Sequence, residues 1–246
     1  MKTVLLLSVL LSSLVLGQNQ PVPKLLRLIP LGQNPVWKEK LKDNVRVGDA
    51  PPAGSLPPTE VTLPSGKKDG VQTAPLQLGV MSKTLRLDAR IPSLQFHEGK
   101  LAAGEPWLKA PVHKSTRSLG VLFRDPTEMT WEKPRILLLD DSEEAFPPGN
   151  IRFVNTAGHT ALVQIGKTAN AVKPGESKML PLKVGDNVIM VGYQERGTGK
   201  QVVINKALTV RIMANQRVQA FFYQNQNKAA DKQLLFQSLP EPPPAL

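Results

Sequence analysis

Residues 151–165 read Ile-Arg-Phe-Val-Asn-Thr-Ala-Gly-His-Thr-Ala-Leu-Val-Gln-Ile, and this stretch decides the fold class. Apolar and polar residues alternate over 151–155, which is the period of a half-buried β-strand, and a second strand-like run follows over 160–165. A Thr-Ala-Gly turn separates the two runs. The pattern therefore predicts two short strands joined by a tight connection.

The same rhythm continues as far as Ser238. Pro174-Gly175 is suited to a type II turn, because glycine tolerates the positive φ that the turn requires. Further strands are expected over 178–182, 188–194, 201–204, 208–213, 218–223 and 234–236, with 195–200 as a hairpin loop. Short strands separated by turns every ~8–12 residues are typical of an antiparallel sandwich or barrel. Residues 146–238 are therefore expected to form one β-domain.

The run Pro148-Gly149-Asn150-Ile151-Arg152-Phe153-Val154-Asn155, followed by the turn over 172–177, resembles the opening of many immunoglobulin-like envelope modules. More narrowly, it is similar to uncharacterised exported bacterial proteins that carry a Pro-x-Gly-x-x-Arg-Phe-x-Asn segment before such a turn. The resemblance covers roughly the C-terminal hundred residues. It implies an antiparallel immunoglobulin-like β-sandwich and no known active site, since this fold hosts many unrelated tasks.

Residues 76–145 also have β character. Thr84 to Ile91 alternates between apolar and polar residues, and 119–123 and 135–139 are short apolar runs flanked by turn residues. We expect a β-rich N-terminal part here. The pattern leaves open whether it packs with residues 146–238 as one domain or forms its own.

Residues 18–75 contain ten prolines, and residues 239–246 end the chain with four more. Proline fixes φ and removes a backbone donor, so such density opposes both helices and central strands. We expect residues 18–75 to form an extended, partly ordered arm. Two apolar pieces, 25–29 and the stretch around Trp37, interrupt it and are expected to clip onto a folded body. The end of the chain is expected to be a proline-stiffened tail.

The first residues indicate where the protein works. Lys2 is followed by an apolar run from Val4 to Leu16 that is shorter than a membrane span. This is typical of a secretory signal peptide over residues 1–17, cut between Gly17 and Gln18. The mature chain is then expected to be exported, periplasmic or secreted, with no transmembrane segment.

Composition narrows the chemistry. The chain has no cysteine, which excludes disulfides, thiolate metal sites and a lipid-modified cysteine. The net charge is +11, with lysine and arginine spread along the chain. Because export removes nucleic acid as a partner, the anionic partners at hand are envelope glycans and lipids. An evenly solvated basic surface is the alternative.

No catalytic or cofactor-binding residue is predicted. The segment 192–200 is rich in glycine but lacks the spacing of a phosphate-binding loop, and a hairpin tip explains it. The three histidines, His97, His113 and His159, do not have the spacing of a metal site. No nucleophile-elbow motif occurs.

The densest acidic cluster contains the weak metal candidates Asp140, Asp141, Glu143 and Glu144. Hard cations such as Ca²⁺ bind several converging carboxylate oxygens. The alternative is a solvated connector in which Ser142 caps a short helical turn.

Three aromatic residues are candidates for contact with a partner: Phe221, Tyr223 and Trp37. In a strand over 218–223, Phe221 and Tyr223 lie on the face opposite Phe222. Core packing is the default for at least one of these faces, and an exposed remainder would mark a docking patch.

These patterns predict a non-enzymatic structural or protein-interaction module of the bacterial cell envelope. A binding module for an anionic envelope glycan or lipid is the second hypothesis, and a hydrolase with an unrecognised site is the third. The sequence indicates neither a specific partner nor an oligomeric state.

Overall fold

The computed structural model describes residues 22–35, 39–42, 45–48, 50–66, 70–99, 104–125, 130–227 and 230–242. Every regular element in these ranges is a β-strand, which confirms the prediction of a mainly β fold. The described residues include no helix that is long and apolar enough to cross a membrane.

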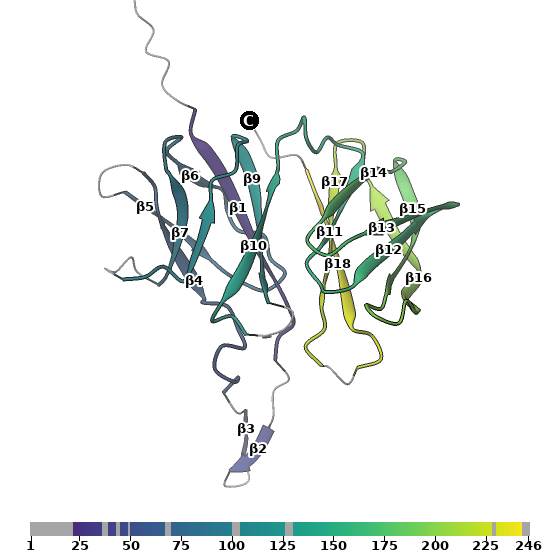
Figure 1. The fold of residues 1–246 in the computed structure, drawn as a ribbon, viewed down its shortest axis with the longest axis horizontal. Coiled ribbons are helices and arrows are strands. Elements are labelled where there is room, and N and C mark those ends of the chain that lie inside the picture. Colours follow the sequence, from purple (N-terminus) through teal and green to yellow (C-terminus); the bar gives the residue numbers. More distant parts are fainter. Residues whose placement is uncertain are drawn as a thin grey trace, which may run out of the picture.

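The N-terminal unit consists of two four-stranded sheets packed face to face (Figure 1). The first sheet has the order β10-β9-β1-β6 and the second has the order β5-β4-β7-β8. Leucines and valines from both sheets form one core around Phe96. The strands are β1 (Lys24–Leu31), β4 (Glu60–Pro64), β5 (Val71–Pro75), β6 (Leu85–Leu87), β7 (Ser93–Glu98), β8 (Leu108–Pro111), β9 (Arg117–Arg124) and β10 (Pro134–Asp140).

The C-terminal unit also consists of two sheets, with the orders β14-β11-β17-β18 and β13-β12-β15-β16. Its core includes Phe153, Tyr193 and Phe222, which are fully buried. The Pro174-Gly175 turn is confirmed, because Gly175 has a φ of 77°. The strands are β11 (Asn150–Asn155), β12 (Thr160–Ile165), β13 (Thr168–Val172), β14 (Ser177–Pro181), β15 (Gly185–Gln194), β16 (Gln201–Ile212), β17 (Arg217–Gln224) and β18 (Leu234–Glu241).

The two units have the same topology. In each, the first strand pairs in parallel with the second-to-last strand, and the remaining strands occupy matching places. The registers match as well, because Arg27 lies opposite Leu119 in β1–β9 and Arg152 lies opposite Gln219 in β11–β17. Residues on the paired strands of one unit therefore have identifiable counterparts in the other.

The units pack against each other through the sheets that contain these parallel pairs, giving four layers of sheet (Figure 1). A separate apolar core fills the contact between the units. It contains Ile29 and Val121 from the N-terminal unit and their counterparts Val154 and Phe221 from the C-terminal unit. Matching residues of the two units therefore meet at the interface, as they do in a contact with twofold symmetry.

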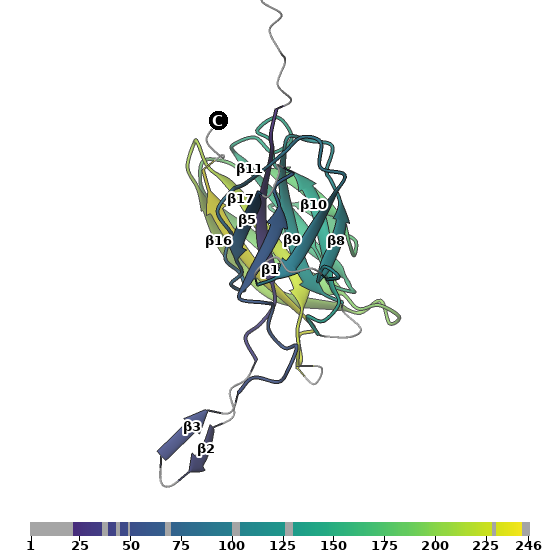
Figure 2. The ribbon, with the colours of Figure 1, turned by 90° about the vertical axis from the view of Figure 1, so that its left-hand side faces the viewer.

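A hairpin of β2 (Glu39–Lys42) and β3 (Val45–Gly48) extends from the body, as Figure 2 shows. It lies in the connection between β1 and β4. The matching connection in the C-terminal unit, between β11 and β12, has only the residues 156–159. The hairpin is therefore an insertion carried by one unit alone.

The prediction of an extended arm over 18–75 is wrong for β1, β4 and β5, which belong to the sheets. Most prolines lie in loops or at strand ends, as with Pro64 and Pro75. Pro30 lies inside β1, but the amide of Leu28, two residues earlier, bonds to Ser82 Oγ at 2.8 Å, on the side away from β9. Amides alternate sides along a strand, so an amide at position 30 would point to the same side as the Leu28 amide, away from β9. Proline at this position therefore leaves the β1–β9 ladder intact.

Two other boundaries differ from expectation. The N-terminal unit begins at β1 rather than at residue 76, because β1 supplies the centre of its first sheet. The tail predicted over 239–246 is wrong up to Glu241, since β18 pairs with β17 as far as Arg217–Glu241. The signal peptide over 1–17 and the candidate Trp37 lie outside the described residues.

Candidate functional site

Asp141 directly follows β10 and is a buried carboxylate, only 2% exposed. Its Oδ2 accepts hydrogen bonds from Arg27 Nε at 3.1 Å and from Arg27 Nη2 at 2.5 Å. Its Oδ1 accepts from Arg152 Nη2 at 3.1 Å and from Arg217 Nη2 at 2.8 Å. One carboxylate thus joins three arginines from both units.

Glu241 completes this charge cluster. Its carboxylate accepts hydrogen bonds from Arg27 Nη1 at 2.7 Å and from Gln219 Nε2 at 3.1 Å. By the register of β10–β9 and β18–β17, Glu241 is the counterpart of Asp141, and Arg152 is the counterpart of Arg27. Each unit therefore offers an arginine to the carboxylate of the other, which is the reciprocal pattern of a symmetric interface.

Phe146 lies beside the buried arginines. The guanidinium carbons of Arg152 and Arg217 lie 4.3 Å and 4.7 Å from the centre of its ring. Arg217 Nη1 also donates to the carbonyl of Phe146 at 3.1 Å. Stacking on an aromatic ring suits arginine, whose planar group is weakly hydrated, and it lowers the cost of burial.

The environment changes the pKa of each arginine differently. Burial lowers the pKa of Arg152 to about 10, although Asp141 opposes this change. Burial lowers the pKa of Arg217 for the same reason. Burial also opposes the charge of Arg27, but its hydrogen bond to Glu241 and its attraction to Asp141 outweigh burial and raise the pKa. All three arginines are therefore charged at neutral pH.

The interpretation of the acidic cluster as a metal site is wrong for Asp141, since both of its oxygens accept bonds from guanidinium groups. Asp140 accepts bonds from Ser115 Oγ and the Ser142 amide, while Glu143 and Glu144 are exposed. No three potential metal ligands come together among the described residues. The Ser142 cap of the alternative agrees with the structure, because Ser142 Oγ accepts from the Ala145 amide at 3.3 Å, but the connector is not solvated at Asp141, which is 2% exposed.

Two of the three aromatic candidates, Phe221 and Tyr223, lie inside the molecule rather than on a docking patch. Phe221 is fully buried in the core between the units, and Tyr223 packs against that core. Burial raises the pKa of Tyr223. The prediction that Phe221 contacts a partner is wrong, because the C-terminal unit uses this strand face to bind the N-terminal unit.

A cleft of about 1050 Å³ opens between the units at the end where β1, β9 and β11 finish. Phe123, Asp125 and Arg135 line it from the N-terminal unit, and Arg135 is paired with Asp125. His159, Gln194, Glu195, Arg196 and Gln224 line it from the C-terminal unit. Clefts between domains are common ligand sites, and this one offers donors and acceptors of both charges.

His159 is the titratable group in this cleft with a shifted pKa. Its Nδ1 accepts a hydrogen bond from the Arg196 amide at 2.9 Å, which leaves the proton of the neutral ring on Nε2. Burial lowers the pKa of His159 and outweighs the attraction to Glu195, which raises it, while repulsion from Arg196 adds a smaller lowering. The described residues of the lining include the hydroxyl groups of Thr156 and Thr160 and no serine, cysteine or lysine.

The remaining sequence motifs have structural roles. Residues 195–200 form the tip of the β15–β16 hairpin, closed by a bond from the Glu195 amide to the Lys200 carbonyl at 2.8 Å, as predicted. His97 lies on β7, His113 follows β8 and His159 precedes β12, so the structure does not bring them together.

Sequence reasoning missed Arg27, Arg152 and Arg217. Their signal is a single arginine beside buried apolar residues, as in Leu26-Arg27-Leu28 and Ile151-Arg152-Phe153. A charge at such a place requires a buried partner. No family model matches the chain, and no curated protein matches it either.

Proposed function

We propose that this chain is a non-enzymatic, exported interaction module of the bacterial cell envelope, built from two immunoglobulin-like β-sandwiches. Export rests on the signal peptide expected over residues 1–17 and its cleavage between Gly17 and Gln18. The chain is then periplasmic or secreted. Its role is to hold a partner on a rigid two-unit body.

The β2–β3 hairpin is the observation that carries this proposal. Leu41 is 73% exposed and Val45 is 61% exposed, and the hairpin extends from the body (Figure 2). An isolated two-stranded hairpin is at best marginally stable in water. A partner that covers these aliphatic side chains would supply the missing burial, so the hairpin is the element that we assign to partner binding.

The base of the hairpin is held in place by the C-terminal unit. Gln226 donates from its amide to Gln33 Oε1 at 3.1 Å and from its side chain to the Gln33 carbonyl at 2.5 Å. Gln33 lies just after β1, where the connection to the hairpin begins. The cleft between the units opens at this same end, since Phe123 lines the cleft and pairs with Leu31. Loops on a rigid scaffold commonly carry binding functions.

The bonding of the charged groups supports a non-enzymatic role. Asp141 and Glu241, the two carboxylates of the buried charge cluster, are engaged by arginines. Among the described residues that line the cleft, the hydroxyl groups are those of Thr156 and Thr160, and Thr156 Oγ1 donates to the Phe222 carbonyl at 3.0 Å. These observations support binding rather than catalysis.

The test is site-specific photo-crosslinking in cells that make the full chain. A photoreactive residue at position 41 is expected to give a discrete adduct with an envelope protein. The matched control places it at Val71, which is 44% exposed on β5 of the N-terminal unit and should give no such adduct. Equal labelling from positions 41 and 71 would contradict the proposal, as would turnover of a substrate that is lost in His159→Ala.

A second candidate function, binding to an anionic envelope glycan or lipid, is favoured by the charge distribution. Residues 146–246 contain 12 lysines and arginines against 5 acidic residues. Retention of the mature chain on lipopolysaccharide should fall steeply as salt rises, because salt screens exposed charges. Retention that does not respond to salt would contradict this candidate.

A further inference from the structure

The outer sheet of the C-terminal unit presents aliphatic side chains to solvent. Strands alternate their side chains between faces, and Ala161, Val163, Ile189 and Val191 point into the core. The residues between them therefore face outward. Val188 is 59% exposed and Val203, on the neighbouring strand, is 40% exposed. We name this the outer face of the C-terminal unit and define it by Leu162, Val188, Met190 and Val203.

The N-terminal unit provides an internal comparison for this face. Val61 pairs with Ala74 and Glu98 in the same way that Ala161 pairs with Val172 and Tyr193. Counting along these strands makes Thr62 the counterpart of Leu162. It also makes Gln95 the counterpart of Met190 and Ser93 the counterpart of Val188.

Gln95 and Ser93 are half-buried, so the shared topology accepts polar residues at the counterparts of Met190 and Val188. The counterpart of Leu162 differs, because Thr62 is 3% exposed. Met190 and Val188 are nevertheless apolar in the C-terminal unit, where Val188 is 59% exposed. Exposed apolar residues that gather on one face are typical of a binding surface.

The outer face is also hollowed. A depression of about 300 Å³ is lined by Leu162, Met190, Gly192 and Val203, among others. Gly192 lies at an irregularity of the β15–β16 ladder, and a Cβ at this position would lie 2.5 Å from the Val202 carbonyl oxygen. The glycine therefore keeps the floor of the depression low.

Two loops at one end of the sheet carry further exposed apolar side chains, beyond the Asp186–Arg211 ion pair. Val184 is 67% exposed, and Met213 is 57% exposed. Both residues lie one position beyond the Gly185–Ile212 pair that ends the β15–β16 ladder. The side chain of Asn187 fixes the first loop, since its amide donates to the Lys183 carbonyl at 2.7 Å and to the Gly185 carbonyl at 3.1 Å. These loops hold their aliphatic side chains outward by internal bonds.

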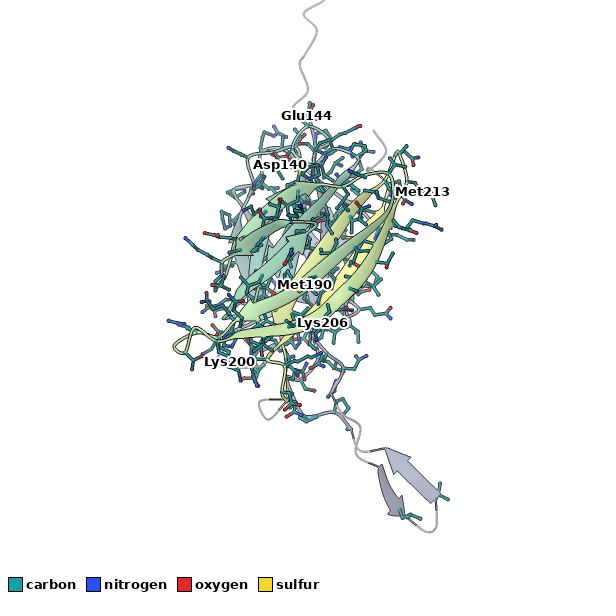
Figure 3. The ribbon with its side chains drawn as sticks, turned by 90° about the vertical axis from the view of Figure 1, so that its right-hand side faces the viewer. Asp140, Glu144, Met190, Lys200, Lys206 and Met213 are labelled. Atoms are coloured by element: carbon teal, nitrogen blue, oxygen red, sulfur yellow. The ribbon has the colours of Figure 1, made fainter. Side chains whose placement is uncertain are left out.

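Cations surround this surface. Figure 3 looks onto the outer face, with Met190 in the middle, Lys206 beside it, Lys200 at one end and Met213 at the other. Lys183 is exposed next to Val184. The acid on the β15–β16 part of the face, Asp186, is paired with Arg211 at 2.9 Å. The surroundings of the apolar surface therefore have a positive charge.

We infer that the outer face of the C-terminal unit is a docking surface for an anionic lipid bilayer. Aliphatic side chains enter the boundary between head groups and acyl chains, while Lys183, Lys200 and Lys206 pair with lipid phosphates. The charge complementarity selects this occupant over an uncharged surface. The inference rests on the second candidate function above and assigns it to one face and one ligand class.

The test is flotation of the mature chain, residues 18–246, with vesicles of known composition. Wild type is expected to float with vesicles of equal parts phosphatidylglycerol and phosphatidylcholine and to bind phosphatidylcholine alone at least about tenfold more weakly. The variant Leu162→Thr, Val188→Ser, Met190→Gln carries the residues of the N-terminal unit at the matching positions. This variant should bind the anionic vesicles at least about tenfold more weakly, because the substitutions remove most of the apolar area that the outer face would bury in the bilayer.

The control is Val71→Thr on β5 of the N-terminal unit, which should bind like wild type. The charge variant Lys200→Gln, Lys206→Gln should weaken binding in low salt and respond less to added salt. Circular dichroism of each variant checks that the sheets are intact.

Three results would overturn the inference. If the triple variant floats like wild type, the outer face is not the lipid contact, although binding through general charge would stand. If wild type does not float with anionic vesicles, both the inference and the lipid form of the second candidate function fail. If the triple variant instead abolishes self-association of a chain that does not bind vesicles, the face is a contact between copies.

Discussion

The two units of this chain share one strand order and one ladder register, yet they differ on nearly every surface that does not join them. Their inner sheets use matched positions, such as Ile29 with Val154 and Val121 with Phe221. The N-terminal unit alone has the β2–β3 hairpin, and the C-terminal unit alone has an aliphatic outer face. We infer from this difference that packing between the units constrains the residues of the inner sheets, whereas the outer surfaces have separate roles.

The charge cluster follows the same logic. Arg27 bonds to Glu241 of the other unit, and its counterpart Arg152 bonds to Asp141. The symmetry is incomplete, because Leu119 stands where the C-terminal unit has Gln219. Asp141 accepts hydrogen bonds from three arginines, whereas Glu241 accepts them from Arg27 and Gln219, so Asp141 is the more important of the two carboxylates.

The largest predicted effect separates these two counterparts. Asp141→Asn leaves Arg152 and Arg217 buried without their shared carboxylate, and the expected loss in the free energy of unfolding is about 3–5 kcal/mol. Glu241→Gln removes fewer charged bonds and should cost about 1.5–3 kcal/mol. Urea unfolding followed by circular dichroism measures both. An equal loss for the two variants would show that the carboxylates are equivalent after all.

The next effect tests the apolar part of the interface. Phe221→Ala empties a fully buried site and should cost about 3–5 kcal/mol. Val121→Ala, at the matched position, removes a smaller side chain and should cost about 1.5–3 kcal/mol. The same unfolding experiment gives both values. A negligible loss for Phe221→Ala would mean that the interface between the units does not form in solution.

A smaller effect concerns pH at the cleft, which has no matching histidine in the N-terminal unit's β1–β4 connection. Because the pKa of His159 in the folded chain lies below its ordinary value of 6.5, its contribution to stability is full above that value. It is lost as pH falls through the folded pKa, since protonated Nδ1 no longer accepts from Arg196. Melting temperature measured against pH should show this fall in wild type, and the fall should be weaker in His159→Gln. Identical profiles would argue against the hydrogen bond.

The smallest effect is expected at the hairpin. Replacement of residues 39–48 by a Gly-Ser linker should change the free energy of unfolding by less than about 0.5 kcal/mol, because the hairpin extends from the body. Thermal unfolding of the two chains checks this. A loss of several kcal/mol would mean that the hairpin belongs to the N-terminal unit's core and is not free for a partner.

The local parts of the fold could be predicted from the sequence. The strand at 151–155 and the Pro174-Gly175 turn depend on neighbouring residues, and both are correct. The strand is buried on both faces rather than half-buried, because Val154 packs into the core between the units. The role of β1 could not be predicted in this way. Its proline is tolerated only because the missing amide faces away from β9, and β9 lies about ninety residues further along the chain.

The charge cluster was hidden for a similar reason. Asp141 follows an apolar run and looks like a solvated acid, while its partners Arg27 and Arg217 lie far away in the sequence. The repetition of the units is equally faint: Arg117 and Arg217 begin matched strands one hundred residues apart, but the residues that follow differ. Only the ladder registers reveal the correspondence.

Scanning calorimetry of residues 18–246 tests most directly the central claim that the two units form a single body. The account predicts one transition in wild type, with equal calorimetric and van 't Hoff enthalpies, and separation into two transitions in Asp141→Asn. Two independent transitions in wild type, unchanged by Asp141→Asn, would contradict it.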